Sequence, residues 1–221
     1  YGSIFGDLES LNGENDMLRE ALGSNDVAGF FIGMLLVISA LIAAVPALMI
    51  NGRMLNEEKS GHLEVIIAGT LNGKVSRMKV FITHYIYGIS AGISAFFLTI
   101  LGMYLASMNV ADLSITIENY VLSAMNYSAG IIFIIGVSAL FAGISKKLHL
   151  AAWLYAAYIF FANYFGVLIN IDEVYLMLSP FYYLSDMPYE SMDISAVLII
   201  TGLGIVLALI RAAVFKRRNL L

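Results

Sequence analysis

Long apolar runs alternate with short polar stretches along this chain. The runs cover residues 27–50, 79–108, 120–144, 148–171 and 192–215, and each has at least 24 residues. An α-helix needs about 20 residues to cross the hydrocarbon layer of a bilayer, so each run can span it with some tilt. The hydrophobic share of 60% exceeds what the core of a soluble domain needs. The pattern predicts an all-α, polytopic membrane protein with five transmembrane helices in a single domain, residues 1–221.

The charged residues between the runs separate by sign. Of the twelve Lys and Arg residues, one is Arg19 and eleven fall in residues 52–79, 146–147 and 211–218. Thirteen of the sixteen carboxylates fall in residues 1–26, 109–119 and 172–193. Because successive helices cross in opposite directions, the basic stretches emerge on one side of the bilayer and the acidic stretches on the other. Lys and Arg resist translocation, so we expect the basic side, with the C-terminus, to be cytoplasmic.

The first 26 residues are polar, with scattered apolar positions. Leu11, Leu18 and Leu22 follow a helical spacing, so we expect an external amphipathic segment over residues 1–26. An N-terminus on the outer side requires a signal peptide or a preceding transmembrane helix, and this stretch has no signal-peptide pattern. The sequence therefore predicts a further transmembrane helix upstream of Tyr1.

The outer loop over residues 172–192 is more apolar than a solvated loop needs to be. It holds two of the three prolines, Pro180 and Pro188, and several aromatic residues around them. Aromatic residues favour the membrane interface, and irregular backbone at membrane depth must be covered by protein. We expect this loop to dip back toward the membrane as an external re-entrant element.

Small and polar residues within the runs indicate where helices pack. Gly88 and Gly92 form a GxxxG pair on one helix face, and such pairs allow close approach of helices in lipid. The run 120–144 carries Gly136 and Gly143, which we also assign to helix packing. Asn126 and Asn163 are asparagines well inside the runs, and each serves either as an interhelical hydrogen-bonding group or as part of a substrate path.

Patterns for catalysis and metal binding are absent or lie in the wrong context. The chain has no Cys, so it offers neither a disulfide framework nor a thiol site. Gly88 to Gly92 fits G-x-S-x-G, but inside an apolar run rather than at a strand-to-helix turn. Three isolated histidines lack metal-ligand spacing and are interpreted as interfacial polar residues: His62, His84 and His149. The sequence predicts no catalytic residue, no metal site and no cofactor.

The charges within the apolar runs bear on the mode of transport. Apart from Asp193 at the outer edge of the last run, no Asp or Glu lies inside a run, although proton- and sodium-coupled carriers commonly use one there. Apart from Lys79 at the edge of the second run, the one basic residue within a run is Arg211. It lies about one helical turn from Lys216, so we expect it to snorkel to the membrane surface. Ion-coupled transport therefore lacks its usual sequence mark.

The longest basic-side stretch, residues 51–78, contains an amphipathic pattern. Glu57 and Glu58 precede Gly61, a residue that can end the incoming helix. After it, Leu63, Ile66 and Ile67 share one helical face, and Glu64 adds a third carboxylate. Helices that lie on membrane surfaces prefer Lys and Arg, so the carboxylates favour a soluble protein partner.

Several short motifs follow one another in a specific order. They are Arg53, Glu57-Glu58-x-x-Gly61-x-x-Glu64, Ile66-Ile67-Ala68, Val75-Ser76-Arg77, Leu178-Ser179-Pro180-Phe181 and the terminal Phe215-Lys216-Arg217-Arg218-Asn219-Leu220. Together they resemble the permeases of bacterial ABC-2 type exporters with the ABCG-like fold, in particular two-halved permeases of antibiotic or multidrug exporters. Asn219 departs from the Asp that is more usual there, and Gly69–Lys74 is longer than usual.

The resemblance implies a C-terminal permease half that lacks its first helix, so that the five runs are the second to sixth helices of a six-helix unit. It implies a coupling helix in the 51–78 loop that contacts a separate ABC ATP-binding subunit through Glu57, Glu58, Gly61, Leu63, Glu64, Ile66 and Ile67. It further implies a second permease half or a homodimer, a location in the plasma membrane among lipids, and no nucleic acid.

The resemblance implies ATP-driven export. We expect the compound to be hydrophobic or amphipathic, since the interiors of the runs offer aromatic and small polar groups but no carboxylate. Two alternatives stay open. One is a carrier, channel or sensor subunit that works without ATP. The other is a membrane-embedded enzyme, for which the sequence offers no buried nucleophile or metal cluster.

Overall fold

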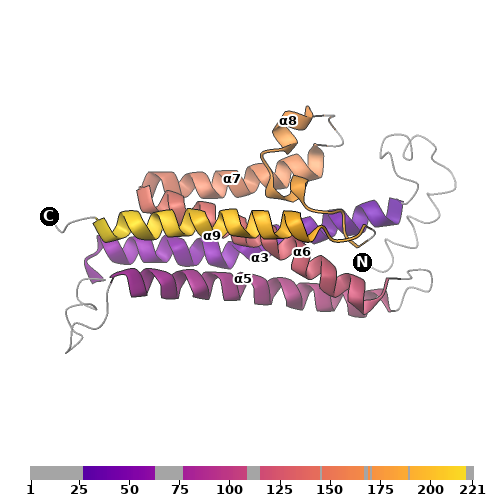
Figure 1. Cartoon of the computed structure of the whole chain (residues 1–221), viewed down its shortest axis with the longest axis horizontal. Helices are drawn as coiled ribbons and strands as arrows, with labels where there is room; N and C mark the ends of the chain where they lie inside the picture. The colour runs from indigo at the N-terminus through magenta and orange to yellow at the C-terminus, as the bar shows by residue number, and fades with distance from the viewer. Residues whose placement is uncertain are drawn as a thin grey trace.

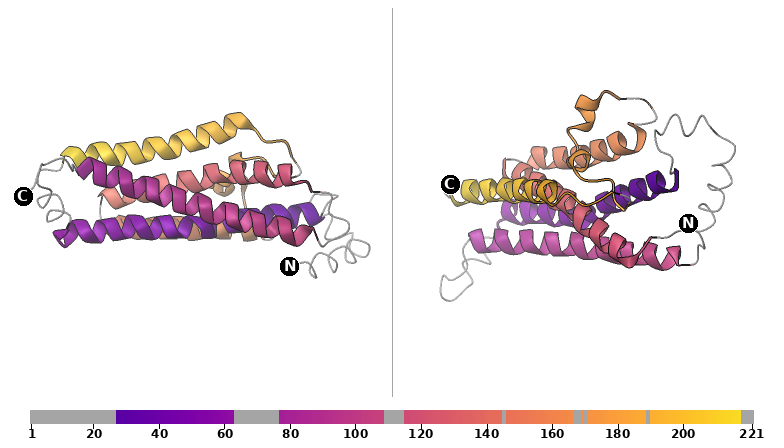
Figure 2. Two further views of the ribbon diagram at one scale, coloured as in Figure 1. Left: turned by 90° about the horizontal axis from the view of Figure 1, so that it is seen from below. Right: turned by 45° about the vertical axis from the view of Figure 1, so that its right-hand side comes forward.

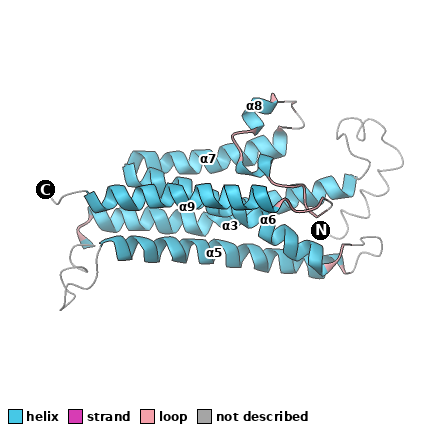
Figure 3. Cartoon of the chain, viewed as in Figure 1, coloured by secondary structure: helices cyan, strands magenta, loops and turns pink. Residues whose placement is uncertain are grey.

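The computed structural model of this chain describes residues 27–62, 77–108, 115–144, 146–166, 169, 171–188 and 190–217, and no strand occurs among them. Its long helices are α3 (Val27–Lys59), α5 (Arg77–Ser107), α6 (Ile117–Ile144), α7 (Lys146–Phe165) and α9 (Ile194–Arg217), with the short α8 (Glu173–Leu176) and the 3-10 helix η1 (Pro180–Tyr183) between α7 and α9 (Figures 1 and 3). Each of the five long helices is long and apolar enough to cross a membrane. The predicted all-α, polytopic fold is confirmed.

Two helix ends differ from the predicted runs, and a glycine follows each. α3 continues through Pro46 and past residue 50 to Lys59, because residues 53–59 are mostly strong helix formers. It ends just before Gly61, whose φ of 74° lies in the left-handed region that favours glycine. α7 ends at Phe165 rather than at residue 171, and a side chain at Gly166 would collide with the Ala162 carbonyl.

The central helix of the bundle is α6. It packs against α3, α5, α7 and α9, while α5 and α7 lie on opposite sides of the bundle (Figure 1). Figure 2 shows α5 crossing α3 obliquely rather than running parallel to it. In the most apolar stretch of α6, 61% of the residues are buried, against 17% in the corresponding stretches of α5 and α7. The outer faces of α5, α7 and α9 expose large apolar side chains, as lipid-facing surfaces do.

The helix ends gather at two poles that differ in charge. At the basic end lie the end of α3, the start of α5, the α6–α7 turn and the end of α9 (Figure 1). At the acidic end lie the end of α5, the start of α6, the end of α7, the segment containing α8 and η1, and the start of α9. The predicted external segment 1–26 and residues 63–76 lie outside the described residues.

The segment between α7 and α9 folds back against the helices at the acidic end. We call residues 171–193 the cap segment, apart from residue 189, which is not among the described residues. Its side chains of Phe181, Leu184 and Met187 are buried in the main core of the bundle. Phe181 fits against Gly130 of α6, where a Cβ atom would lie only 2.4 Å from the Phe181 ring. The absence of a side chain at residue 130 therefore makes room for the cap segment.

Candidate functional site at the basic end of the bundle

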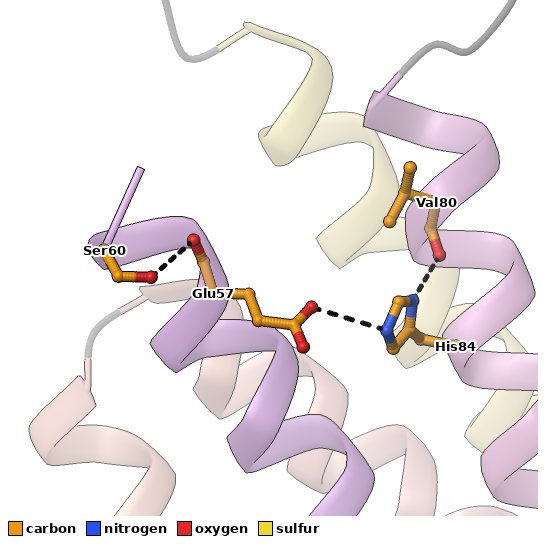
Figure 4. A network of polar contacts seen from close by, with 4 residues as sticks. All are labelled: Glu57, Ser60, Val80 and His84. Carbon is orange, nitrogen blue, oxygen red and sulfur yellow. Dashed lines mark hydrogen bonds and ion pairs between the residues drawn. The ribbon is translucent and has the colours of Figure 1, made fainter. Parts of the chain in front are cut away.

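The last turn of α3 faces the start of α5 through two ionisable side chains. A Glu57 Oε2 atom lies 3.9 Å from His84 Nε2, and the two side chains are 43% and 30% exposed (Figure 4). The other ring nitrogen, Nδ1, lies 2.9 Å from the Val80 carbonyl one turn earlier in α5. A carbonyl oxygen only accepts, so Nδ1 carries a hydrogen. The imidazole is thereby oriented with Nε2 toward the Glu57 carboxylate.

The sequence-predicted ATPase-contact residues fall into two groups. Glu57 and Glu58 lie in the last turn of α3, and Gly61 follows its end. Ser60 donates a hydrogen bond to the Glu57 carbonyl at 3.2 Å, which fixes the chain as it leaves the helix (Figure 4). The remaining predicted contact residues lie outside the described part of the chain: Leu63, Glu64, Ile66 and Ile67. The structure therefore places Glu57, Glu58 and Gly61 at the basic end of the bundle.

Arg211 of α9 is a buried cation close to this site, and the expectation that it snorkels to the surface is wrong. Its side chain is 2% exposed and donates a hydrogen bond of 3.1 Å to the Gly143 carbonyl, one residue before the end of α6. The guanidinium also lies 5.9 Å from the centre of the Phe81 ring in α5. A cation is favourable at a helix C-terminus and over an aromatic face, so inward packing replaces exposure. Arg211 thus joins α9, α6 and α5.

Two further contacts, one hydrogen bond and one close packing contact, join α3 to its neighbours at this end. The Asn51 amide donates to Ser138 Oγ of α6 at 3.1 Å, and both side chains are buried. His149 lies in the first turns of α7 against Gly52, where a Cβ atom would come within 2.8 Å of its Nε2. His149 therefore packs from the first turns of α7 against α3, at the basic end of the bundle.

The glycines assigned to helix packing occupy two different interfaces. Gly88 and Gly92 of α5 lie against α3, with built Cβ atoms 3.4 Å from Ala47 and 3.1 Å from the Ala43 carbonyl. Gly136 of α6 lies against Gly204 of α9, where a Cβ would meet the Gly204 carbonyl oxygen at 2.2 Å. A Cβ at the fourth assigned glycine, Gly143, would meet the Arg211 side chain at 2.2 Å. The close approach is tightest between α6 and α9.

The two intramembrane asparagines both bond to the cap segment. Asn126 is fully buried, and its amide nitrogen donates to the Ser185 carbonyl at 2.9 Å. Its Oδ1 atom is buried without a hydrogen-bond partner among the described residues. Asn163 donates to Ser179 Oγ at 2.9 Å and to the Ile159 carbonyl of its own helix at 2.8 Å. These amides fasten α6 and α7 to the cap segment.

The outer part of the cap segment carries paired acidic groups. Glu190 accepts a hydrogen bond from the Asp186 backbone at 3.1 Å. Partial burial, and next the charge of Glu190, raise the pKa of Asp186 above its usual value of 3.8. Tyr182 donates to the Glu173 carboxylate, and this hydrogen bond raises the pKa of the tyrosine. Among the described residues, no group of three His, Asp or Glu side chains could hold a metal ion.

Several residues at these contacts carried no usable signal in the sequence. His84 is a lone histidine in an apolar run, and its partner Glu57 is 27 positions earlier in the chain. Gly204 is one of two glycines spaced two apart in α9, and the spacing alone does not say which of them faces α6. Only the packing of the helices distinguishes these positions.

Comparison with known proteins gives the family. Residues 1–216 match the family described as "multidrug efflux system permease Rv1217c, C-terminal domain". No individually curated protein matches the chain. The match covers all five long helices, which agrees with a membrane permease of an exporter rather than with an enzyme. The chain belongs to the family of C-terminal domains of multidrug efflux system permeases.

Proposed function

We propose that this chain is the permease half of an ATP-driven ABC exporter that moves a hydrophobic or amphipathic compound out of the cell. One observation carries the proposal: a chain that matches the family of multidrug efflux permeases has Glu57 and Glu58 in the last turn of α3, with Gly61 just after it, at the basic end of the bundle. There the chain leaves the helix toward the amphipathic stretch after Gly61. ATP hydrolysis takes place on a separate ATP-binding subunit.

The proposed mechanism assigns the two ends different tasks. At the cytoplasmic, basic end, a coupling helix over Leu63, Ile66 and Ile67 inserts its apolar face into the ATPase, with Glu64 as a polar anchor. ATP-driven closure of the ATPase pushes this helix and moves α3 and α5. The substrate passes between this half and a second permease half or second copy, along α3 and α6. Asn126 is the proposed polar group on that path in α6, since its Oδ1 atom is free to accept a hydrogen bond.

The orientation is tested by labelling. The chain has no Cys, so single cysteines can be introduced without background. Ser60 lies at the basic end and Ser185 in the cap segment at the acidic end. An impermeant thiol reagent should label Ser60→Cys only from the cytoplasmic side and Ser185→Cys only from outside. Labelling of both from the same side would refute the proposed orientation.

The ATPase partnership is tested by purification with a candidate ATP-binding subunit encoded beside this gene. Charge-assisted contacts contribute about 1.5–3 kcal/mol each when shielded and less at a wet rim. Reversing Glu57 and Glu58 to Lys together should therefore weaken substrate-stimulated hydrolysis while leaving the membrane fold intact. Failure of the wild-type permease to form a complex with any ATPase would overturn the proposed function.

A further inference from the structure

We propose that Glu57 and His84 form a clasp that holds the end of α3 against the start of α5, and so positions the loop between them for the ATPase. The two residues flank that loop, from residue 60 to residue 76, on its two sides. This inference rests on the proposed function, because it concerns how the coupling loop is presented. It assigns Glu57 a contact within the permease, separate from its proposed contact with the ATPase.

The geometry favours a specific contact over a chance approach. His84 cannot turn freely, since its Nδ1 atom is held by the Val80 carbonyl at 2.9 Å. That hydrogen bond directs Nε2 at the Glu57 carboxylate, 3.9 Å away (Figure 4). With Nδ1 acting as a donor, attraction to the carboxylate is strongest when Nε2 is also protonated and the ring is positive.

Other basic groups at this end of the bundle come from α3, α5, α7 and α9. Arg53 precedes Glu57 by one turn on α3 and is exposed, and Lys79 is an exposed residue near the start of α5. From the other helices, Arg211 of α9 bonds to Gly143 and His149 of α7 packs on Gly52. The clasp therefore links α3 to α5, whereas Arg211 links α5 to α6 and α9.

The Glu57–His84 clasp adds to an α3–α5 contact in which small residues already allow close approach. Gly88 and Gly92 of α5 lie on Ala47 and Ala43 of α3, which sets the crossing of the two helices within the membrane. Nearer the basic end, Met54 of α3 and Phe81 of α5 are buried in one apolar cluster, and α3 continues beyond it to Lys59. The contact at Glu57 holds this last turn of α3 against α5, so both ends of the coupling loop are held in one spacing.

The first test needs no ATPase and asks whether the contact exists. A double-mutant cycle is measured by reversible unfolding of the full-length permease, with Glu57→Gln, His84→Gln and the double variant. Each single variant should lower the folding equilibrium constant roughly two- to fivefold, as an exposed ion pair does, and the double variant should lower it no further. Thr83→Val is the matched control, because the Thr83 hydroxyl bonds to the Lys79 carbonyl of its own helix at 2.8 Å. Additive effects would overturn the clasp.

The second test asks whether the clasp positions the loop. His84→Gln should retain complex formation with the ATPase yet lower substrate-stimulated hydrolysis roughly two- to fivefold. Glu57→Lys should lower it further, and His84→Glu added to Glu57→Lys should restore it, because the pair is then rebuilt with its charges exchanged. If Glu57 acts only by binding the ATPase, the His84→Glu change on α5 should not restore hydrolysis in the Glu57→Lys variant. No rescue, with intact assembly of the wild type, would overturn the clasp and leave the proposed function standing.

Discussion

The close contact between α6 and α9 gives the sharpest test of the fold. At Gly136 a Cβ atom would lie 2.2 Å from the Gly204 carbonyl oxygen, whereas ordinary contact begins at 3.4 Å. The change Gly136→Ala therefore requires α9 to move away by about 1.2 Å or α6 to rotate, because a backbone oxygen cannot turn aside as a flexible side chain can. In lipid, helices associate through close packing, so this separation removes much of what joins the pair.

The size of the effect follows from two opposing terms. Replacing a glycine inside a helix with alanine favours the helix by about 0.5–1 kcal/mol. Overpacking a tight contact costs about 1–3 kcal/mol, and this site is at the upper end because backbone meets backbone. We expect Gly136→Ala to lower the free energy of unfolding by about 2 kcal/mol. The matched control is Gly202→Ala in α9, since a Cβ at Gly202 meets nothing within 4 Å.

The assay is reversible unfolding of the purified permease in detergent, followed by the fluorescence of its single tryptophan, Trp153. Trp153 lies in α7 and packs against the main core, so it reports loss of the bundle. Gly202→Ala should match or exceed the stability of the wild type. If Gly136→Ala proves as stable as Gly202→Ala, the close approach of α6 and α9 is not as described and the packing argument fails.

Three further outcomes follow from single side chains. Arg211→Ala should lower the free energy of unfolding by about 2–4 kcal/mol, because it empties a buried volume beside Phe81 and removes a charged donor; Arg211→Met, which keeps the stem, should cost less in the same unfolding assay. Asp193→Ala should cost about 0.5–2 kcal/mol, since Asp193 Oδ1 accepts the backbone N–H groups of Ser195 and Ala196 at the start of α9, and Asp193→Asn should retain most of that stability. For Asp186 the folded-state pKa is raised, so its contribution to stability is lost as the pH rises above 3.8 through the folded-state pKa; Asp186→Asn should raise the melting temperature at pH 7 and flatten its decrease over that window.

The number and order of the helices could be predicted from the sequence because the signals are local and repeated. Each span is a long apolar run, and the charges between the runs divide by sign. The helix ends were less predictable. α3 passes from apolar to polar residues without a break, and the first residue that stops it is Gly61 at φ 74°. Hydropathy marks where a membrane segment ends, whereas backbone conformation decides where a helix ends.

The sequence indicated which side chains need a partner, but not which residues the partners are. The sequence indicates that Asn126 and Asn163 are expensive to bury and need partners, but their partners lie in the cap segment, whose path depends on Phe181 packing over Gly130. For Arg211, the sequence favoured exposure although the side chain is buried. Its distance from Lys216 favours snorkelling, and its actual position depends on Gly143 and Phe81, which come from two other helices. Contacts between helices require the packing arrangement, which hydropathy does not contain.

The α3–α5 and α6–α9 contacts differ in how closely the two backbones approach. α3 meets α5 through alanines and glycines at ordinary or slightly tight distances, whereas α6 meets α9 through Gly136 and Gly204 with their backbones in contact. Close backbone packing with an enclosed Arg211 leaves α6 and α9 little freedom to slide, because any shift drives backbone into backbone. Among the described residues, α3 and α5 make no comparable contact between backbones, and the Glu57–His84 contact at their basic end is partly exposed. If the proposed coupling is correct, variants of Glu57 and His84 should alter substrate-stimulated hydrolysis, whereas variants of Gly136 should alter stability.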